Sequence, residues 1–138
     1  MNPRRVLALS TAIIFAVSFL LPAYTTFNGF SCFRMCWGIL VKLPPEKWSA
    51  WLYYGGFAVS NILFVGFLAL AFAGRTFSRG CIVLISILCL HVLSWLVVDS
   101  VNYGWGTNIR IGYFVWLLAY ILQTYTCMKF RKTSGAAG

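Results

Sequence analysis

His91 is the only histidine of the chain, and it lies near the middle of a long apolar segment. A titratable side chain at the centre of such a segment is costly, so we expect it to face the interior and to have a partner. Asn61 and Tyr120 lie near the middle of two other apolar segments, and Gln123 lies one turn beyond Tyr120. These four residues predict a polar interior, with a hydrogen-bonded layer at the depth of His91.

Three roles are open to His91. As a neutral imidazole it would bond Asn61, Tyr120 or a backbone carbonyl, an interhelical contact that contributes about 0.6 to 2 kcal/mol. It would also suit the axial position of a cofactor, a buried macrocycle of the haem or chlorophyll type, because neutral imidazole is the commonest metal ligand. The third role is a proton relay that leads to Asp99, nearer the end of the same segment. Packing is the first expectation, because it requires neither a cofactor nor a proton path.

Cys32 and Cys36 form a C-x-x-x-C pair between the first two apolar segments. An oxidising compartment would permit a disulfide between them, and the alternative is a pair of free apolar thiols. The pair lacks a nearby histidine or further cysteines, so it does not predict a zinc site. We expect no other metal site in the chain.

Catalytic sets are missing from the sequence. Glu46 and Asp99 are the only acids, and the chain has no glycine-rich phosphate loop, no H-E-x-x-H and no G-x-S-x-G pattern. We therefore do not expect an enzyme.

The composition indicates whether these residues are surrounded by water or by lipid. Hydrophobic residues make up 61% of the chain and charged residues 9%, against about 45–50% and about 25% in soluble domains. The net charge is +9, but the cations fall between apolar runs and form no basic face. Anionic lipid headgroups, and not nucleic acid, are the expected partners of this charge.

Four segments carry no charged residue: 6–24, 48–74, 80–98 and 111–128. A helix needs about 20 residues to cross the roughly 30 Å of hydrocarbon, and a backbone in lipid must satisfy its own hydrogen bonds. We predict an all-α polytopic membrane protein with four transmembrane helices in an antiparallel bundle. Residues 1–138 form a single transmembrane domain with an outer loop at 25–47 and a flexible tail at 133–138.

The distribution of lysine and arginine predicts the orientation. Seven cations lie at the two termini and between the second and third segments, and four lie in the other two connections. The positive-inside rule then places both termini in the cytoplasm, in a cell inner (plasma) membrane. The first segment also has the basic start of a signal peptide, but its apolar stretch is longer than the 7 to 15 residues or so of a leader, so we expect it to span.

Sequence spacing also predicts how the helices pack. The connection 75–79 is so short that the second and third segments must be neighbours. Gly55, Gly56 and Ser60 predict a closely packed face on the second segment. On the fourth segment one stripe at helical spacing is expected to face inward; it comprises Tyr113, Trp116, Tyr120, Gln123, Thr124 and Cys127.

Six tryptophans fall outside the membrane or in its outer half on this topology: Trp37, Trp48, Trp51, Trp95, Trp105 and Trp116. One interpretation is an interfacial belt that anchors the helices. The other is an aromatic surface that receives a partner protein, a quinone, a pigment or a lipid.

These observations favour a small non-enzymatic integral membrane protein. The expected function is that of an accessory or structural subunit of a larger inner-membrane complex, with His91 as the candidate cofactor ligand. An intramembrane recognition protein, such as a toxin-immunity protein, is the first alternative. A self-assembling channel or transporter is the second, and its polar path would have to use Asn61, His91, Tyr120 and Gln123. The expected partners are membrane lipids and other membrane-protein subunits.

Overall fold

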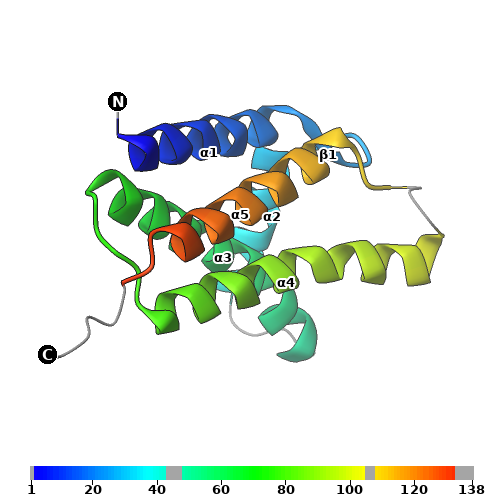
Figure 1. Cartoon of the computed structure of the whole chain (residues 1–138). Coiled ribbons are helices and arrows are strands. Elements are labelled where there is room, and N and C mark those ends of the chain that lie inside the picture. The colour runs from blue at the N-terminus through cyan, green and yellow to red at the C-terminus, as the bar shows by residue number, and fades with distance from the viewer. Residues whose placement is uncertain (1, 43–47, 105–107, 133–138) are drawn as a thin grey trace, which may run out of the picture.

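The computed structural model describes residues 2–42, 48–104 and 108–132 and is mostly helical. Four helices are long and apolar enough to cross a membrane, as predicted; they are α1 (Pro3–Leu20), α3 (Trp48–Phe72), α4 (Arg79–Tyr103) and α5 (Ile111–Lys129). Between α1 and α3 lie the short strands β1 (Pro22–Tyr24) and β2 (Phe27–Asn28) and the helix α2 (Gly29–Val41) (Figure 1).

Local sequence signals set several helix ends. Asn2, Asn28 and Ser78 each cap a helix, because their side-chain oxygens accept hydrogen bonds from the first-turn amides of α1, α2 and α4. The first helix ends at Leu20 and not at the expected residue 24. Pro22 cannot donate the next helical hydrogen bond, and the chain turns there into the β1–β2 hairpin.

Two further expected boundaries differ from the structure. The outer loop predicted at 25–47 contains β2 and the thirteen residues of α2. The third long helix runs to Tyr103, past the expected end at 98, and stops at Gly104, which has a φ of 85°. Asp99 is thus a helical residue, although its charge had marked the end of the apolar segment.

The start of α1, the end of α5 and the α3–α4 connection lie on one side of the molecule (Figure 1). The Arg4 guanidinium lies 4.6 Å from the centre of the Phe130 ring and donates to the carbonyl of Gly74. The Phe77 amide donates to the Phe130 carbonyl at 3.2 Å, and the Lys132 amide donates to the Phe77 carbonyl at 2.9 Å. These contacts tie the start of α1, the end of α3 and the end of α5 together.

The closest helix packing joins α1 with α5 and α2 with α3. Helices α3 and α4 also touch, as their short connection predicts, but over less of their length. Their contact includes a hydrogen bond of 2.9 Å between the Tyr53 and Ser94 hydroxyls. Gly55 faces α2, where an added Cβ would lie 2.9 Å from Leu40 Cδ1, while Gly56 faces His91 of α4. The predicted close packing is confirmed at both glycines.

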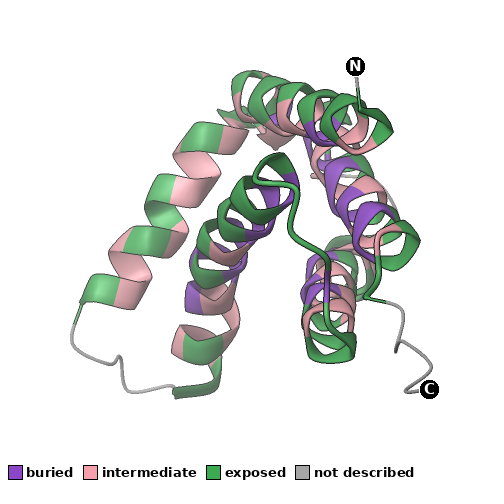
Figure 2. Ribbon diagram, turned by 60° about the vertical axis from the view of Figure 1, so that its left-hand side comes forward, coloured by how far each residue is buried: buried purple, intermediate pink, exposed green. Residues whose placement is uncertain are grey.

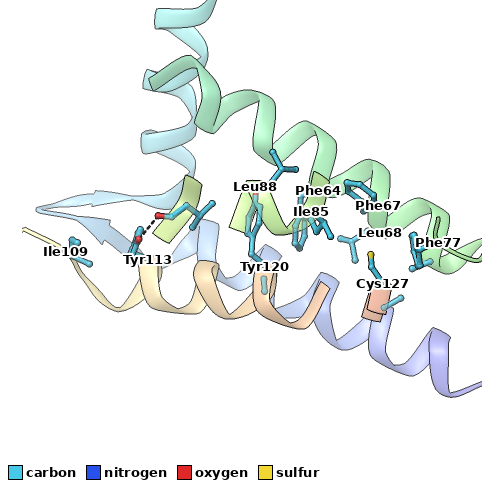
Figure 3. Close-up of a cluster of buried hydrophobic side chains, with 14 residues drawn as sticks. Phe64, Phe67, Leu68, Phe77, Ile85, Leu88, Ile109, Tyr113, Tyr120 and Cys127 are labelled. Atoms are coloured by element: carbon cyan, nitrogen blue, oxygen red, sulfur yellow. Dashed lines mark hydrogen bonds between the residues drawn. The ribbon is translucent and has the colours of Figure 1, made fainter. Parts of the chain in front are cut away.

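A buried apolar cluster fills the interior between α3, α4 and α5 (Figure 3). Phe64, Ile85 and Tyr120 are fully buried in it, and the Phe64 and Tyr120 rings lie 4.6 Å apart between their centres. Outside this cluster α4 carries a row of exposed apolar side chains, and α2 has no buried residue (Figure 2). Exposed apolar faces of this kind suit a hydrocarbon environment.

Candidate functional site

A cavity of about 410 Å³ lies at the end of the molecule opposite the chain termini. It is enclosed by the end of α1, the β1–β2 hairpin, α2, the first half of α3, the end of α4 and the start of α5. Aromatic and aliphatic side chains dominate its lining, and few polar groups reach it. Ligand pockets in proteins typically have volumes of about 300 to 1,000 Å³ and a lining of this kind.

Helix α4 contributes one wall through residues at helical spacing. Trp95, Val98, Asp99 and Asn102 all line the cavity, because positions three and four apart share a helix face. Asp99 is only 1% exposed. Its Oδ1 accepts a hydrogen bond of 3.3 Å from Asn108 Nδ2, whereas its buried Oδ2 has no hydrogen-bond partner among the described residues. A buried carboxylate oxygen without a partner is costly.

Aromatic rings surround the carboxyl end of this wall. The Trp95 ring makes edge contacts with Tyr24 of β1 and Tyr54 of α3, with ring centres 5.5 and 5.8 Å apart. Burial and, to a smaller extent, the adjacent Asp99 carboxylate together raise the pKa of Tyr24 to about 12. Tyr24 therefore stays neutral at physiological pH and keeps its hydroxyl proton beside the carboxylate.

Helix α2 contributes the opposite wall, with Cys32 and Cys36 one turn apart. Both are free thiols in the structure, so the alternative of a bridge between them is not formed there. Residues four apart on a helix keep their Cβ atoms about 5–6 Å apart, and a disulfide needs about 3.5–4.5 Å. Burial raises the pKa of both thiols, that of Cys36 to about 11. They present protonated, weakly polar surface at neutral pH.

His91 lies outside the lining of the cavity and packs against α3. Its ring centre is 4.4 Å from that of Phe57 and 5.2 Å from that of Tyr53. A Cβ added at Gly56 would lie 2.9 Å from His91 Nε2, so this nitrogen faces the α3 backbone. Nε2 has no hydrogen-bond partner in the part of the chain that the structure describes. This geometry favours the packing role.

The other members of the expected polar interior do not bond to His91. Asn61 Oδ1 accepts from Trp116 Nε1 at 2.9 Å, and Asn61 Nδ2 donates to the Phe57 carbonyl at 2.9 Å. Gln123 is fully buried, with its Nε2 3.8 Å from the Cys127 sulfur. The Tyr120 hydroxyl is buried without a partner among the described residues. The structure therefore joins Asn61 to α5 through a tryptophan and not to α4 through the histidine.

The tryptophans of the expected outer aromatic surface divide into two groups. Trp95 and Trp116 line the cavity. Trp37 and Trp48 are exposed, at 43% and 63%, and Trp51 is half-buried with its ring centre 5.6 Å from that of Trp48. Trp105 lies outside the described residues. Sequence spacing had suggested an aromatic surface, but only the fold separates the residues that face inward.

The structure also adds residues that sequence reasoning had not assigned to a site. Tyr24, Tyr54 and Phe57 line the cavity beside Asp99. Asp99 had been considered only as the exit of a proton path. The spacing of Trp95, Asp99 and Tyr103 at i, i+4 and i+8 was the available signal that they share one helix face.

Comparison of the chain with protein-family models, curated proteins and solved structures finds no match in any of the three. The chain is a helical membrane protein with four apolar helices of spanning length and an aromatic cavity at the end opposite its termini.

Proposed function

We propose that this chain is a non-enzymatic integral membrane protein that binds one apolar molecule in its aromatic cavity. The observation that carries this proposal is the cavity of about 410 Å³ with its aromatic lining. Rings supply large apolar contact area, and the few polar groups, Asn61 and Asp99 among them, would orient the bound molecule. Lipid on the outside of the helices gives such a molecule a direct source.

The proposal includes an orientation in the membrane. The helices cross as an antiparallel bundle, with both termini in the cytoplasm and the cavity in the outer half of an inner membrane. Support comes from the end where the termini meet, since it carries seven of the eleven cations of the chain. Arg4 and Phe130 make contact at that end. The start of α1 and the end of α5 therefore lie on the same side, as an even number of crossings requires.

Two expectations from the sequence lie outside this proposal. The role of accessory subunit in a larger complex stays a prediction, because the exposed apolar face of α4 suits both acyl chains and a partner helix. A macrocycle held by His91 is not part of the proposal, since Nε2 faces Gly56 at close distance.

Photolabelling tests the proposal with residue resolution. The protein is placed in nanodiscs of a neutral glycolipid and exposed to an octyl diazirine probe, and labelled peptides are mapped by mass spectrometry. If the probe binds in the cavity, it labels the cavity walls in a saturable way, and excess n-octanol displaces the probe. Labelling of lipid-facing positions such as Val101, which is 78% exposed, rises with probe concentration without saturating.

Two substitutions at adjacent positions make a matched pair for this experiment. Val98 lines the cavity, and Val97 is 60% exposed on the other face of α4. We expect Val98→Trp to fill the space and abolish saturable labelling, and Val97→Trp to leave it intact. If labelling of the wild type is not saturable anywhere along the cavity walls, the proposed function is wrong.

A further inference from the structure

We infer that the cavity recognises the head group of its ligand as an organic ammonium, held by the Asp99 carboxylate among aromatic rings. The inference rests on the proposed function, because it names the chemistry of the molecule that the cavity binds. The ligand would be an amphiphilic amine with an apolar body and a protonated amino group.

The first argument is the state of Asp99 itself. The residue is 1% exposed and lines the cavity, and its Oδ2 has no hydrogen-bond partner among the described residues. Buried carboxylates are normally paired with a cation or with several donors. Asn108 supplies one donor, to Oδ1. The Tyr24 hydroxyl also lies beside the carboxylate. Oδ2 still makes no hydrogen bond among the described residues, and Asp99 lines the cavity, so a bound ammonium group would supply its partner.

The second argument is the kind of surface beside the carboxylate. Tyr24, Tyr54 and Trp95 pack edge to ring around this end of the cavity. Ring faces attract cations, and an ammonium group among several rings gains most where water is excluded. Aromatic rings and a carboxylate therefore both favour a positively charged group over a hydroxyl.

The third argument concerns the charges of the chain. Arg110 follows the loop beyond α4, but its Nε donates to the Thr25 carbonyl at 3.4 Å and its side chain is exposed. The net charge of the whole chain is +9, so non-specific attraction would favour anions. A preference for an amine would therefore report the site around Asp99 and not the overall charge.

Two competitors of the same chain length test the inference, n-octylamine and n-octanol. Each displaces the octyl diazirine probe in neutral glycolipid nanodiscs, and the concentration that halves the saturable label is measured. At neutral pH the amine is protonated. Asp99→Asn keeps an acceptor for Asn108 and removes the charge. Ser100→Ala is the control at the adjacent position of α4, because Ser100 does not line the cavity and its hydroxyl donates to the Leu96 carbonyl of its own helix.

We expect the wild type and Ser100→Ala to bind the amine more tightly than the alcohol. A charge-assisted hydrogen bond corresponds to about tenfold or more in affinity, so Asp99→Asn should lose that factor for the amine and bind the alcohol as before. Because each competitor is compared between variants in the same lipid, its partitioning into the bilayer cancels. Retained alcohol binding also shows that the variant is folded.

The opposite results separate this inference from the function beneath it. Equal displacement by amine and alcohol in the wild type, or an undiminished preference in Asp99→Asn, overturns the ammonium assignment and leaves an apolar binding site. Absence of saturable labelling in the wild type removes both. If Asp99→Asn loses alcohol binding as well, the wild-type ratio of the two competitors decides the question alone, after each concentration has been corrected for the measured partitioning of that competitor into the glycolipid.

Discussion

Side-chain hydroxyls and amides within the apolar helices make two kinds of hydrogen bond. Some donate to a carbonyl of their own helix, as the Ser60 hydroxyl donates to the Gly56 carbonyl at 2.7 Å. Others join two helices. Trp116 Nε1 donates to Asn61 Oδ1. The Tyr113 hydroxyl donates to the Val92 carbonyl at 2.6 Å, the bond drawn as a dashed line at Tyr113 in Figure 3. The second kind fixes α5 against α3 and α4 at the wall of the cavity.

Tyr113→Phe tests one of these links. It removes only the hydroxyl from a side chain that is 4% exposed, and we expect a loss near 1 kcal/mol, the usual scale of an interhelical hydrogen bond. Tyr125→Phe is the control, because Tyr125 is 50% exposed on the same helix. Reversible unfolding in mixed micelles measures both. Equal stabilities of the two variants would show that the Tyr113 bond contributes nothing.

Cys36 allows a prediction about reactivity and redox state. A free thiol reacts with a membrane-impermeant maleimide without reductant, and a pKa of about 11 makes the thiolate scarce at neutral pH. We expect labelling about tenfold slower than for an exposed cysteine, since the greater nucleophilicity of a basic thiolate offsets part of its scarcity. The rate should rise as the pH increases toward 11.

The control places a cysteine at Trp37, the exposed neighbour of Cys36, in a chain with serine at positions 32 and 36. That thiol should react at the ordinary rate. Labelling of native Cys36 that begins only after reductant is added would show a disulfide and contradict the free thiols of the structure.

Close backbone contact at the cavity end of the molecule depends on glycine. A Cβ at Gly112, in the first turn of α5, would lie 2.6 Å from the Pro22 carbonyl oxygen and 2.7 Å from that of Leu21. These are backbone atoms and cannot rotate away. Gly112 thus lets the segment between α1 and the hairpin lie directly against α5, where it closes one side of the cavity.

Gly112→Ala should therefore destabilise the protein by about 1 to 3 kcal/mol, the usual cost of overpacking. Gly66→Ala is the matched substitution, since nothing lies within 4 Å of a Cβ at that position of α3. Alanine is the better helix former, so Gly66→Ala should leave stability unchanged or slightly higher. Denaturant midpoints of the two variants check this, and a neutral Gly112→Ala would mean that the hairpin does not touch α5.

The long helices were predictable from the sequence because their signal is uninterrupted. Four charge-free runs of spanning length admit only helices in lipid. Helix α2 and the hairpin were not predicted, since their short segments mix polar and apolar residues and depend on contact with α1, α3 and α5. The end of α4 was placed too early because a charged residue is a poor marker of a helix end when a fold can bury it, as it buries Asp99.

The cavity was predictable only in its composition. The sequence predicted that aromatic residues gather in one half of the membrane. Which of them face inward depends on the angle at which α4 diverges from α3 and on the position of α2, and neither is encoded in a single segment. The expected layer of Asn61, His91 and Tyr120 failed as a hydrogen-bonded unit because the Phe57 ring lies against His91 and the tryptophan of α5 takes the Asn61 oxygen.

The whole chain brings its two ends together, and this allows a test of orientation. Reporter fusions after Arg79 and after Lys132 should both report cytoplasm, because those segments carry most of the cations. A reporter inserted at residue 42, after α2, should report the opposite side. A cytoplasmic signal from position 42 would contradict the proposed topology, whatever the cavity binds.

Occupancy of the cavity is measured most directly by native mass spectrometry of the protein ejected from its own membrane fragments. The account predicts a species heavier than the bare chain by the mass of one apolar molecule. This species should persist in Val97→Trp and disappear in Val98→Trp, because Val98 lines the cavity and Val97 does not. A bare chain in all three proteins, or an added mass that Val98→Trp retains, would contradict the claim that this cavity is a binding site.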